Sequence, residues 1–208
     1  MSAAPLIFLH GWAASKEVWR LQKELGRDFR IFFVELRGHG SSPWQNSRTL
    51  LKDFTQDLRE FCRQKKIRAA HFVAWSMAGH IILELAKENP QLLASAVLVN
   101  CTSKLLNSAG YSCGISAGNL NWLRRKLNLN PAAALDEFRM YMFSPEEKQA
   151  ENFPQVWDIL AQIPLPHSEA LRLGLDLLER EDLRSRLEEV VVPTLIISGD
   201  NDSITPPA

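Results

Sequence analysis

The stretch His71-Phe-Val-Ala-Trp-Ser-Met-Ala-Gly79 decides the fold. Its apolar run at residues 72–75 predicts a buried strand, and residues 77–89, which are ended by Pro90, predict a helix. Ser76 stands at the sharp turn between the two elements. A serine on such a turn, with small residues two positions before and after it, is typical of a nucleophile elbow.

The elbow suits nucleophilic chemistry for two reasons. The turn lifts the Ser76 hydroxyl clear of the sheet, and the backbone N–H of Met77 opens the helix without a helical partner, free to stabilise a developing oxyanion. The flanking residues must be small because a bulky side chain collides in so tight a turn. They are Ala74 and Ala78 instead of the usual glycines, with a glycine only at Gly79. The pattern alone therefore leaves open an ordinary serine in a strand–helix turn.

Length, charge and cysteine use restrict the class of protein. The 208 residues fit one domain, or one domain with a sizeable insertion, and 46% of them are hydrophobic, enough for a core. Lys+Arg and Asp+Glu number 24 each, so no basic field indicates binding to nucleic acid or to an anionic membrane. No signal peptide is evident, since the apolar run at residues 6–9 is too short. Three cysteines without a CxxC spacing favour reduced thiols and a cytoplasmic location.

Apolar runs alternate with amphipathic segments along most of the chain. Residues 18–25, 50–66 and 77–89 are expected to be helices. The expected buried strands are residues 6–9, 31–34, 72–75, 95–99 and 193–198. This alternation predicts an α/β fold with a mostly parallel sheet and helices on both faces.

The rhythm is interrupted by a helical block without strand signals. Asn130-Pro131 predicts a helix start, Ser144 and Glu147 have the spacing of a capping box, and residues 168–179 predict another helix. We therefore expect a core formed by residues 1–103 and 188–208. Residues 104–187 would form a helical cap, or lid, over the carboxyl edge of the sheet.

Three loops follow predicted strands and should meet at that edge, where open α/β sheets place their sites. They are His10-Gly-Trp12, the Ser76 elbow, and the acidic loop with Asp200 and Asp202. Together with Arg37-Gly-His-Gly40, they make the chain resemble the α/β-hydrolase family along almost its whole length. The order serine and then aspartate is that family's order.

The resemblance implies a catalytic role for Ser76 as nucleophile and for Asp202 as acid. Asp202 is preferred to Asp200 because Gly199, Asp202 and Pro206 fit the pattern Gly-x-x-Asp-x-x-x-Pro. The implied reaction is that of a serine hydrolase, which cleaves a carboxylic ester through an acyl-enzyme.

The resemblance also implies an oxyanion hole and a substrate pocket. The backbone N–H groups of Trp12 and Met77 would form the oxyanion hole, while the His10 side chain would brace the loop. Trp75 would border the acyl pocket. Met142 and Phe143 would line the same pocket or belong to the core of the cap, because helical spacing does not separate the two readings. We expect no cofactor, and no histidine pair has metal-ligand spacing on one helix face.

Within the family, several segments are similar to the carboxylesterases of biotin synthesis, which act on pimeloyl–carrier-protein methyl ester. They are Leu9-His-Gly-Trp12, Trp75-Ser-Met-Ala-Gly79, Ile163-Pro-Leu-Pro166 and Gly174-Leu-Asp-Leu-Leu178 leading to Asp182-Leu183. This implies a small acyl ester as substrate, carried on an acyl carrier protein. Arg124-Arg-Lys126 and Arg139 are either a docking patch for that acidic carrier or a solvated helix face.

The chain departs from the family in its histidines. The family's general base lies some tens of residues beyond the acid, whereas no histidine follows His167 here. His39 and His167 remain as remote candidates for the base. The sequence resembles a hydrolase whose carboxyl end is cut before the last strand, the catalytic histidine and the last helix. Two alternatives follow. The chain is a catalytically silent protein that binds a ligand or partner. Alternatively, it is a piece of a hydrolase with an uncovered sheet edge, present as a monomer or as a dimer paired through that edge.

Overall fold

A computed structural model describes residues 3–45 and 51–206. The strands of this part of the chain pair in parallel and form one sheet. Its five strands have the order β2-β1-β3-β4-β5. They are β1 (Pro5–Leu9), β2 (Arg30–Val34), β3 (Ala70–Trp75), β4 (Leu93–Val99) and β5 (Thr194–Ile197). The predicted α/β fold with a parallel sheet is confirmed.

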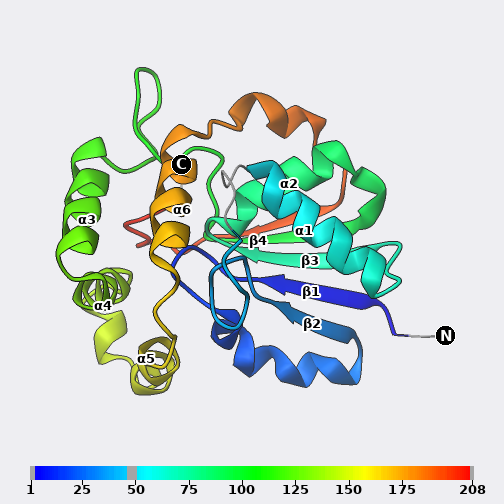
Figure 1. The fold of residues 1–208 in the computed structure, drawn as a ribbon, viewed down its shortest axis with the longest axis horizontal. Coiled ribbons are helices and arrows are strands. Elements are labelled where there is room, and N and C mark those ends of the chain that lie inside the picture. Colours follow the sequence, from blue (N-terminus) through cyan, green and yellow to red (C-terminus); the bar gives the residue numbers. More distant parts are fainter. Residues whose placement is uncertain (1–2, 46–50, 207–208) are drawn as a thin grey trace.

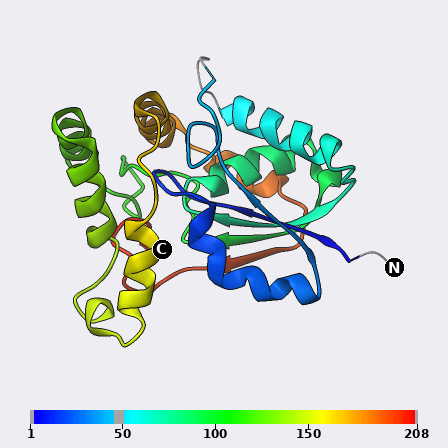
Figure 2. The same ribbon diagram turned by 60° about the horizontal axis from the view of Figure 1, so that its bottom comes forward.

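Helices cover both faces of the sheet (Figure 2). The α-helices α1 (Leu51–Gln64) and α2 (Ala78–Glu88) lie on one face, and the 3-10 helix η1 (Lys16–Arg27) lies on the other. The amphipathic pattern of α1 buries Phe54 and Leu58 against the core. The helix expected at residues 18–25 is present within η1, and its turns are of the 3-10 type. A short 3-10 turn, η2 (Pro90–Leu92), leads from α2 into β4.

The centre of the sheet is the core, and its β5 edge is open. Ile7 in β1 and Phe72 in β3 have no exposed surface. In β5, by contrast, Leu195, Ile196 and Ile197 are 57%, 69% and 47% exposed. The prediction that residues 193–198 form a buried strand is wrong, because within the described residues β5 pairs only with β4 and its residues are all exposed. The uncovered sheet edge that one of the alternatives predicted is observed in this described part of the chain.

The segment between β4 and β5 forms the helical block that the sequence predicts. It comprises α3 (Ala117–Leu129), α4 (Pro131–Tyr141), η3 (Glu147–Gln149), α5 (Phe153–Ala161) and α6 (Ser168–Arg180), followed by η4 (Arg184–Glu189). The helices α3 to α6 lie beyond the carboxyl ends of the strands (Figure 1), whereas η4 lies against α2. The exact division into a core and a cap at residues 104 and 187 stays a prediction.

Both local helix signals of the block are confirmed. The side chain of Asn130 accepts a hydrogen bond from the backbone N–H of Ala133 at 3.1 Å, which caps α4 ahead of its first-turn proline. The backbone N–H of Ser144 donates to the Glu147 carboxylate at 2.7 Å, and the Glu147 N–H donates to the Ser144 hydroxyl at 3.2 Å. This reciprocal pair is a capping box.

Two contacts fasten the block to the core. The indole Nε1 of Trp12 donates to the backbone carbonyl of Leu171 in α6 at 2.9 Å. The backbone N–H of His167 donates to the carbonyl of Gly38 at 2.8 Å. Gly38 has a positive φ of 72°, a conformation that glycine adopts without strain. The amino end of α6 is therefore fixed over the loops that follow β1 and β2.

Candidate active site

The elbow has the strand, turn and helix that the sequence predicts. Ser76 follows β3 and has a φ of 54°, in the left-handed region that costs a non-glycine residue free energy. Its backbone N–H donates to the carbonyl of Val99 at 3.0 Å, and its carbonyl accepts from the N–H of Gly79 at 2.8 Å. A Cβ added at Gly79 would lie 2.6 Å from Sγ of Cys101, so this position requires glycine. The surrounding packing holds the strained turn in place.

The backbone N–H groups of Trp12 and Met77 are free within the described residues, where neither donates a hydrogen bond. The loop that carries Trp12 lies against the elbow, since a Cβ added at Gly11 would be 3.0 Å from Cβ of Ser76. Met77 is the N-cap of α2, so its N–H adds to the positive end of the helix dipole. This arrangement can stabilise negative charge that develops beside Ser76.

The loop that carries Trp12 is braced by two buried histidines. The Nδ1 of His10 bonds the carbonyl of Gly11 at 2.8 Å, and its Nε2 accepts from the N–H of Leu36 at 3.1 Å. The Nε2 of His39 accepts from the N–H of Ala13 at 3.3 Å. Burial lowers the pKa of His39 to about 4. His39 is therefore a neutral bracing group, and its ring nitrogens are engaged away from Ser76.

The Asp202 carboxylate is held by four donors. Its Oδ1 accepts from the backbone N–H groups of Ile204 and Thr205 at 2.7 and 2.8 Å. Its Oδ2 accepts from the Thr205 hydroxyl at 2.9 Å and from the side-chain amide of Asn100. Asn100, at the carboxyl end of β4, has a positive φ of 46°. Asp200 is exposed, so of the two candidate acids only Asp202 is fixed at the site.

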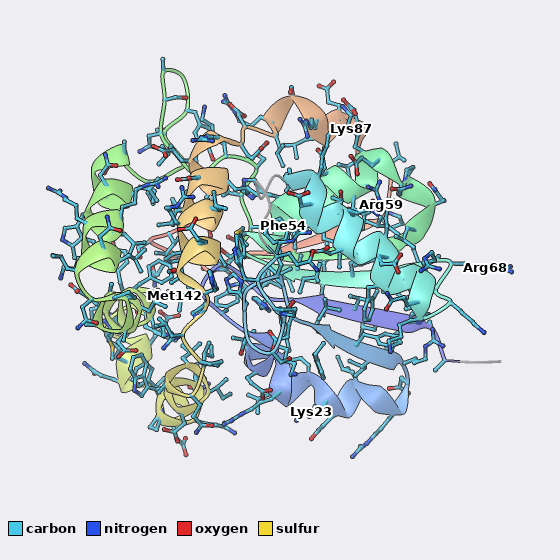
Figure 3. The ribbon with its side chains drawn as sticks, viewed as in Figure 1. Lys23, Phe54, Arg59, Arg68, Lys87 and Met142 are labelled. Atoms are coloured by element: carbon cyan, nitrogen blue, oxygen red, sulfur yellow. The ribbon has the colours of Figure 1, made fainter. Side chains whose placement is uncertain are left out.

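One cavity of about 380 Å³ brings the predicted site residues together. All seven line it: Trp12, Trp75, Ser76, Met77, Met142, Phe143 and Asp202. Met142 lies where the helical block approaches the sheet (Figure 3). Most of the wall is apolar, which suits a hydrocarbon chain. The individual roles of these residues stay predictions.

Other lining residues were missed by sequence reasoning. Asn100 and Thr205 flank the acid, and the wall also includes Val18 and Trp19 of η1 together with Leu175 of α6. Asn100 could have been found from its position directly after a strand, at the edge where sites gather. The η1 and α6 residues could not, because their apolar spacing only marks a face that packs against another element.

Within the described residues, no histidine ring forms a hydrogen bond with Ser76 or Asp202. The chain has five histidines. His71 bonds the hydroxyl of Ser95 at 2.8 Å, and Nδ1 of His167 accepts from the N–H of Glu169 at 3.2 Å, capping α6. Neither remote candidate for the base, His39 nor His167, therefore forms a hydrogen bond with the nucleophile in this structure.

The arginine-rich segment of the block is largely neutralised. Arg124 pairs with Asp176 and with Glu179, the latter at 2.7 Å. Lys126 pairs with Glu137, and Arg139 is 7% exposed and pairs with Asp136. The ion pairs of Arg124 and Lys126 favour the solvated helix face over the docking patch for an acidic carrier protein, whereas the buried Arg139 fits neither reading.

Metal and membrane signals are absent from residues 3–45 and 51–206. No group of three or more His, Cys, Asp or Glu side chains in this part of the chain is placed to hold a metal ion. No helix there is both long enough and apolar enough to cross a membrane.

Sequence comparisons identify relatives over nearly the whole chain. The family model described as the alpha/beta hydrolase family matches residues 6–208. A pimeloyl-[acyl-carrier protein] methyl ester esterase of Nitrosomonas europaea is 29% identical over 202 residues, 97% of this chain and 78% of the relative. The enzyme of the same description from Hamiltonella defensa is 28% identical over 201 residues, 96% of this chain and 75% of that protein.

Solved structures share the fold. An esterase from Exiguobacterium antarcticum superposes with a TM-score of 0.85 at 24% identity and covers 99% of this chain and 76% of its own. A bromoperoxidase from Bacillus anthracis has a TM-score of 0.86 at 23% identity with the same coverage. At these identities the likeness extends to the fold alone.

Proposed function

The chain belongs to the alpha/beta hydrolase family and is a carboxylic ester hydrolase, and we propose that Ser76 attacks the ester carbon to form an acyl-enzyme. One observation carries this proposal. Ser76 stands on a strained elbow in the wall of an apolar cavity, beside two backbone N–H groups, of Trp12 and Met77, that have no partner in the described chain.

The geometry supports a two-step reaction. In the first step, the Ser76 oxygen bonds the carbonyl carbon, and the carbonyl oxygen becomes an oxyanion that accepts hydrogen bonds from Trp12 and Met77. Collapse of this intermediate breaks the bond to the leaving alcohol, which takes up the proton that Ser76 lost. In the second step, water attacks the acyl carbon, the bond from that carbon to the Ser76 oxygen breaks, and the Ser76 oxygen takes up the proton that the water loses as the acid is released. One oxyanion donor contributes about 3–4 kcal/mol to lowering such a barrier.

The reaction needs a group that accepts the Ser76 proton. In the proposal this group is an imidazole placed between Ser76 and Asp202, whose carboxylate would orient it. None of the five histidines makes this contact in the structure. Free imidazole added to the solution is the direct chemical substitute for such a base.

We further propose that the substrate is pimeloyl–carrier-protein methyl ester. The descriptions of the related enzymes support this substrate, and the apolar cavity suits its methylene chain. The enzyme would then act in the cytoplasm on an acyl group carried by an acyl carrier protein, with residues 104–187 as the cap. It would be either a monomer or a dimer paired through β5. Ile196→Lys places a charge on this exposed edge strand and should prevent such pairing. Sedimentation of the parent and of this variant distinguishes the monomer from the dimer.

The decisive experiment measures hydrolysis of p-nitrophenyl butyrate by the 208-residue chain, by Ser76→Ala and by Ser41→Ala, each with and without imidazole. Ser41 is exposed and serves as the matched control. We expect the parent and Ser41→Ala to exceed Ser76→Ala and to gain further from imidazole, after subtraction of the reaction with imidazole alone. Equal rates for the parent and Ser76→Ala under both conditions would contradict the role of Ser76.

A further inference from the structure

His80 lies in the wall of the active-site cavity and has no part in the reaction described above. It follows Ser76 by four residues and belongs to the first turn of α2. Side chains on a helix tilt toward its amino end, and the amino end of α2 is the elbow. The Cα–Cβ bond of His80 therefore tilts toward the elbow, and the residue lines the same cavity as Ser76.

His80 is the unpaired histidine of the described chain. Its side chain has no exposed surface, and neither Nδ1 nor Nε2 has a hydrogen-bond partner. The rings of the other four histidines all make hydrogen bonds, namely His10, His39, His71 and His167. A buried polar group without a hydrogen-bond partner costs free energy. Such a group in a folded protein therefore indicates either a functional role or a bound water molecule.

The surroundings define the kind of group that His80 can bind. Burial lowers its pKa to about 4, and the amino end of α2 also disfavours a positive charge there. A neutral imidazole offers one donor and one acceptor. The cavity residues include one charged side chain, Asp202, and no lysine or arginine to balance a buried carboxylate. An uncharged carbonyl or hydroxyl oxygen therefore matches the site best.

We propose that His80 selects esters whose acyl chain carries an uncharged carbonyl or hydroxyl oxygen a few bonds from the scissile carbonyl. The inference rests on the proposed function only in that the ligand is an ester bound beside Ser76. The His80 ring is covered in this structure, and the cavity wall also contains the leucines Leu105, Leu175 and Leu178. A change of leucine rotamer in this wall would uncover a ring edge for an entering chain.

The test measures binding in a Ser76→Ala background, so that no ester is hydrolysed. The ligands are methyl hexanoate and its 3-oxo, 4-oxo and 5-oxo analogues, and the signal is the fluorescence of tryptophans such as Trp12 and Trp75 in the cavity wall. At least one oxo ester is expected to bind about tenfold more tightly than methyl hexanoate. Adding His80→Leu should abolish this preference, while His80→Gln, which keeps a donor and an acceptor, should retain part of it.

His71→Leu is the matched control, because it makes the same substitution at a half-buried histidine that lies outside the cavity. The control should keep the full preference. The inference is overturned if no oxo ester binds more tightly, as would occur when a retained water satisfies His80, or if the preference survives in His80→Leu. If His80→Leu fails to fold, as judged by circular dichroism, His80→Met takes its place in the test. Loss of the preference for oxo esters in His80→Met would then support the inference. Because binding is read without hydrolysis, an inactive Ser76 would contradict the proposed function and leave this result standing.

Discussion

Gly174 of α6 lies directly against the indole ring of Trp12. A Cβ added at Gly174 would lie 2.5 Å from Cδ1 of Trp12 and 3.0 Å from its Nε1, and 3.5 Å from Sδ of Met77. One helix of the block therefore touches both residues whose N–H groups form the proposed oxyanion hole. The position of α6 and the geometry of that hole are coupled through this contact.

Replacing Gly174 by alanine is expected to displace Trp12 or α6 by enough to disturb the proposed oxyanion donors. We expect kcat for ester hydrolysis to fall about tenfold with a smaller change in KM, and the free energy of unfolding to fall by about 1–3 kcal/mol. Gly118→Ala in α3 is the control, because its added Cβ meets only the Ser116 hydroxyl at an ordinary 3.6 Å. Unchanged kinetics for Gly174→Ala would show that the contact is not coupled to the site.

Trp12→Phe tests the hydrogen bond that fastens α6. The variant leaves the carbonyl of Leu171 without its indole donor, so we expect urea unfolding to show a loss of about 1–3 kcal/mol. Trp122→Phe is a suitable control, since Trp122 is 42% exposed on α3. Equal stability of the two variants would mean that water replaces the lost donor.

Stability should fall as the pH is lowered from about 6.5 to about 4. The folded-state pKa values of His39 and His80 are lowered to about 4, so the unfolded chain binds protons in this window that the folded chain does not. Each histidine removes up to about 3 kcal/mol by pH 4 and nothing above pH 7. Urea unfolding between pH 7 and pH 4.5 measures the loss.

His80→Leu isolates one contribution to this acid sensitivity. The variant should lose less stability than the parent over the same pH range, because it has one fewer group to protonate on unfolding. At pH 7 it should also be the more stable protein, since the unpaired ring nitrogens are gone. Parallel pH profiles for the parent and the variant would contradict the lowered pKa.

Asp202→Asn tests the four-donor arrangement of the acid. An amide cannot accept from all four donors, and its NH₂ would face at least one of them, so we expect a loss of about 1–3 kcal/mol. Asp200→Asn, at an exposed position of the same loop, should change stability by less than about 0.5 kcal/mol. Thermal unfolding of the two variants side by side makes the comparison.

Much of the fold follows from local patterns in the sequence. The apolar runs predicted all five strands, and the elbow, the Asn130 helix start and the Ser144 capping box appear where the pattern placed them. These features depend on residues close together in the chain, such as a side chain that caps its own helix. The gathering of the loops at one edge also follows from the sequence, because parallel strands end on the same side.

Tertiary structure decided the rest. The approach of Gly174 to Trp12, the ion pairs of Arg124 and the isolation of His80 all depend on which distant segments meet. An apolar run or a histidine has the same appearance in sequence whether its neighbours cover it, bond it or leave it alone. The sequence thus determined the secondary-structure elements and the reactive side chains that they present. The packing of α6 against the core determined which of these side chains are paired, buried or unpaired. The physical reason is that burial and hydrogen bonding between distant segments arise only when folding brings those segments together.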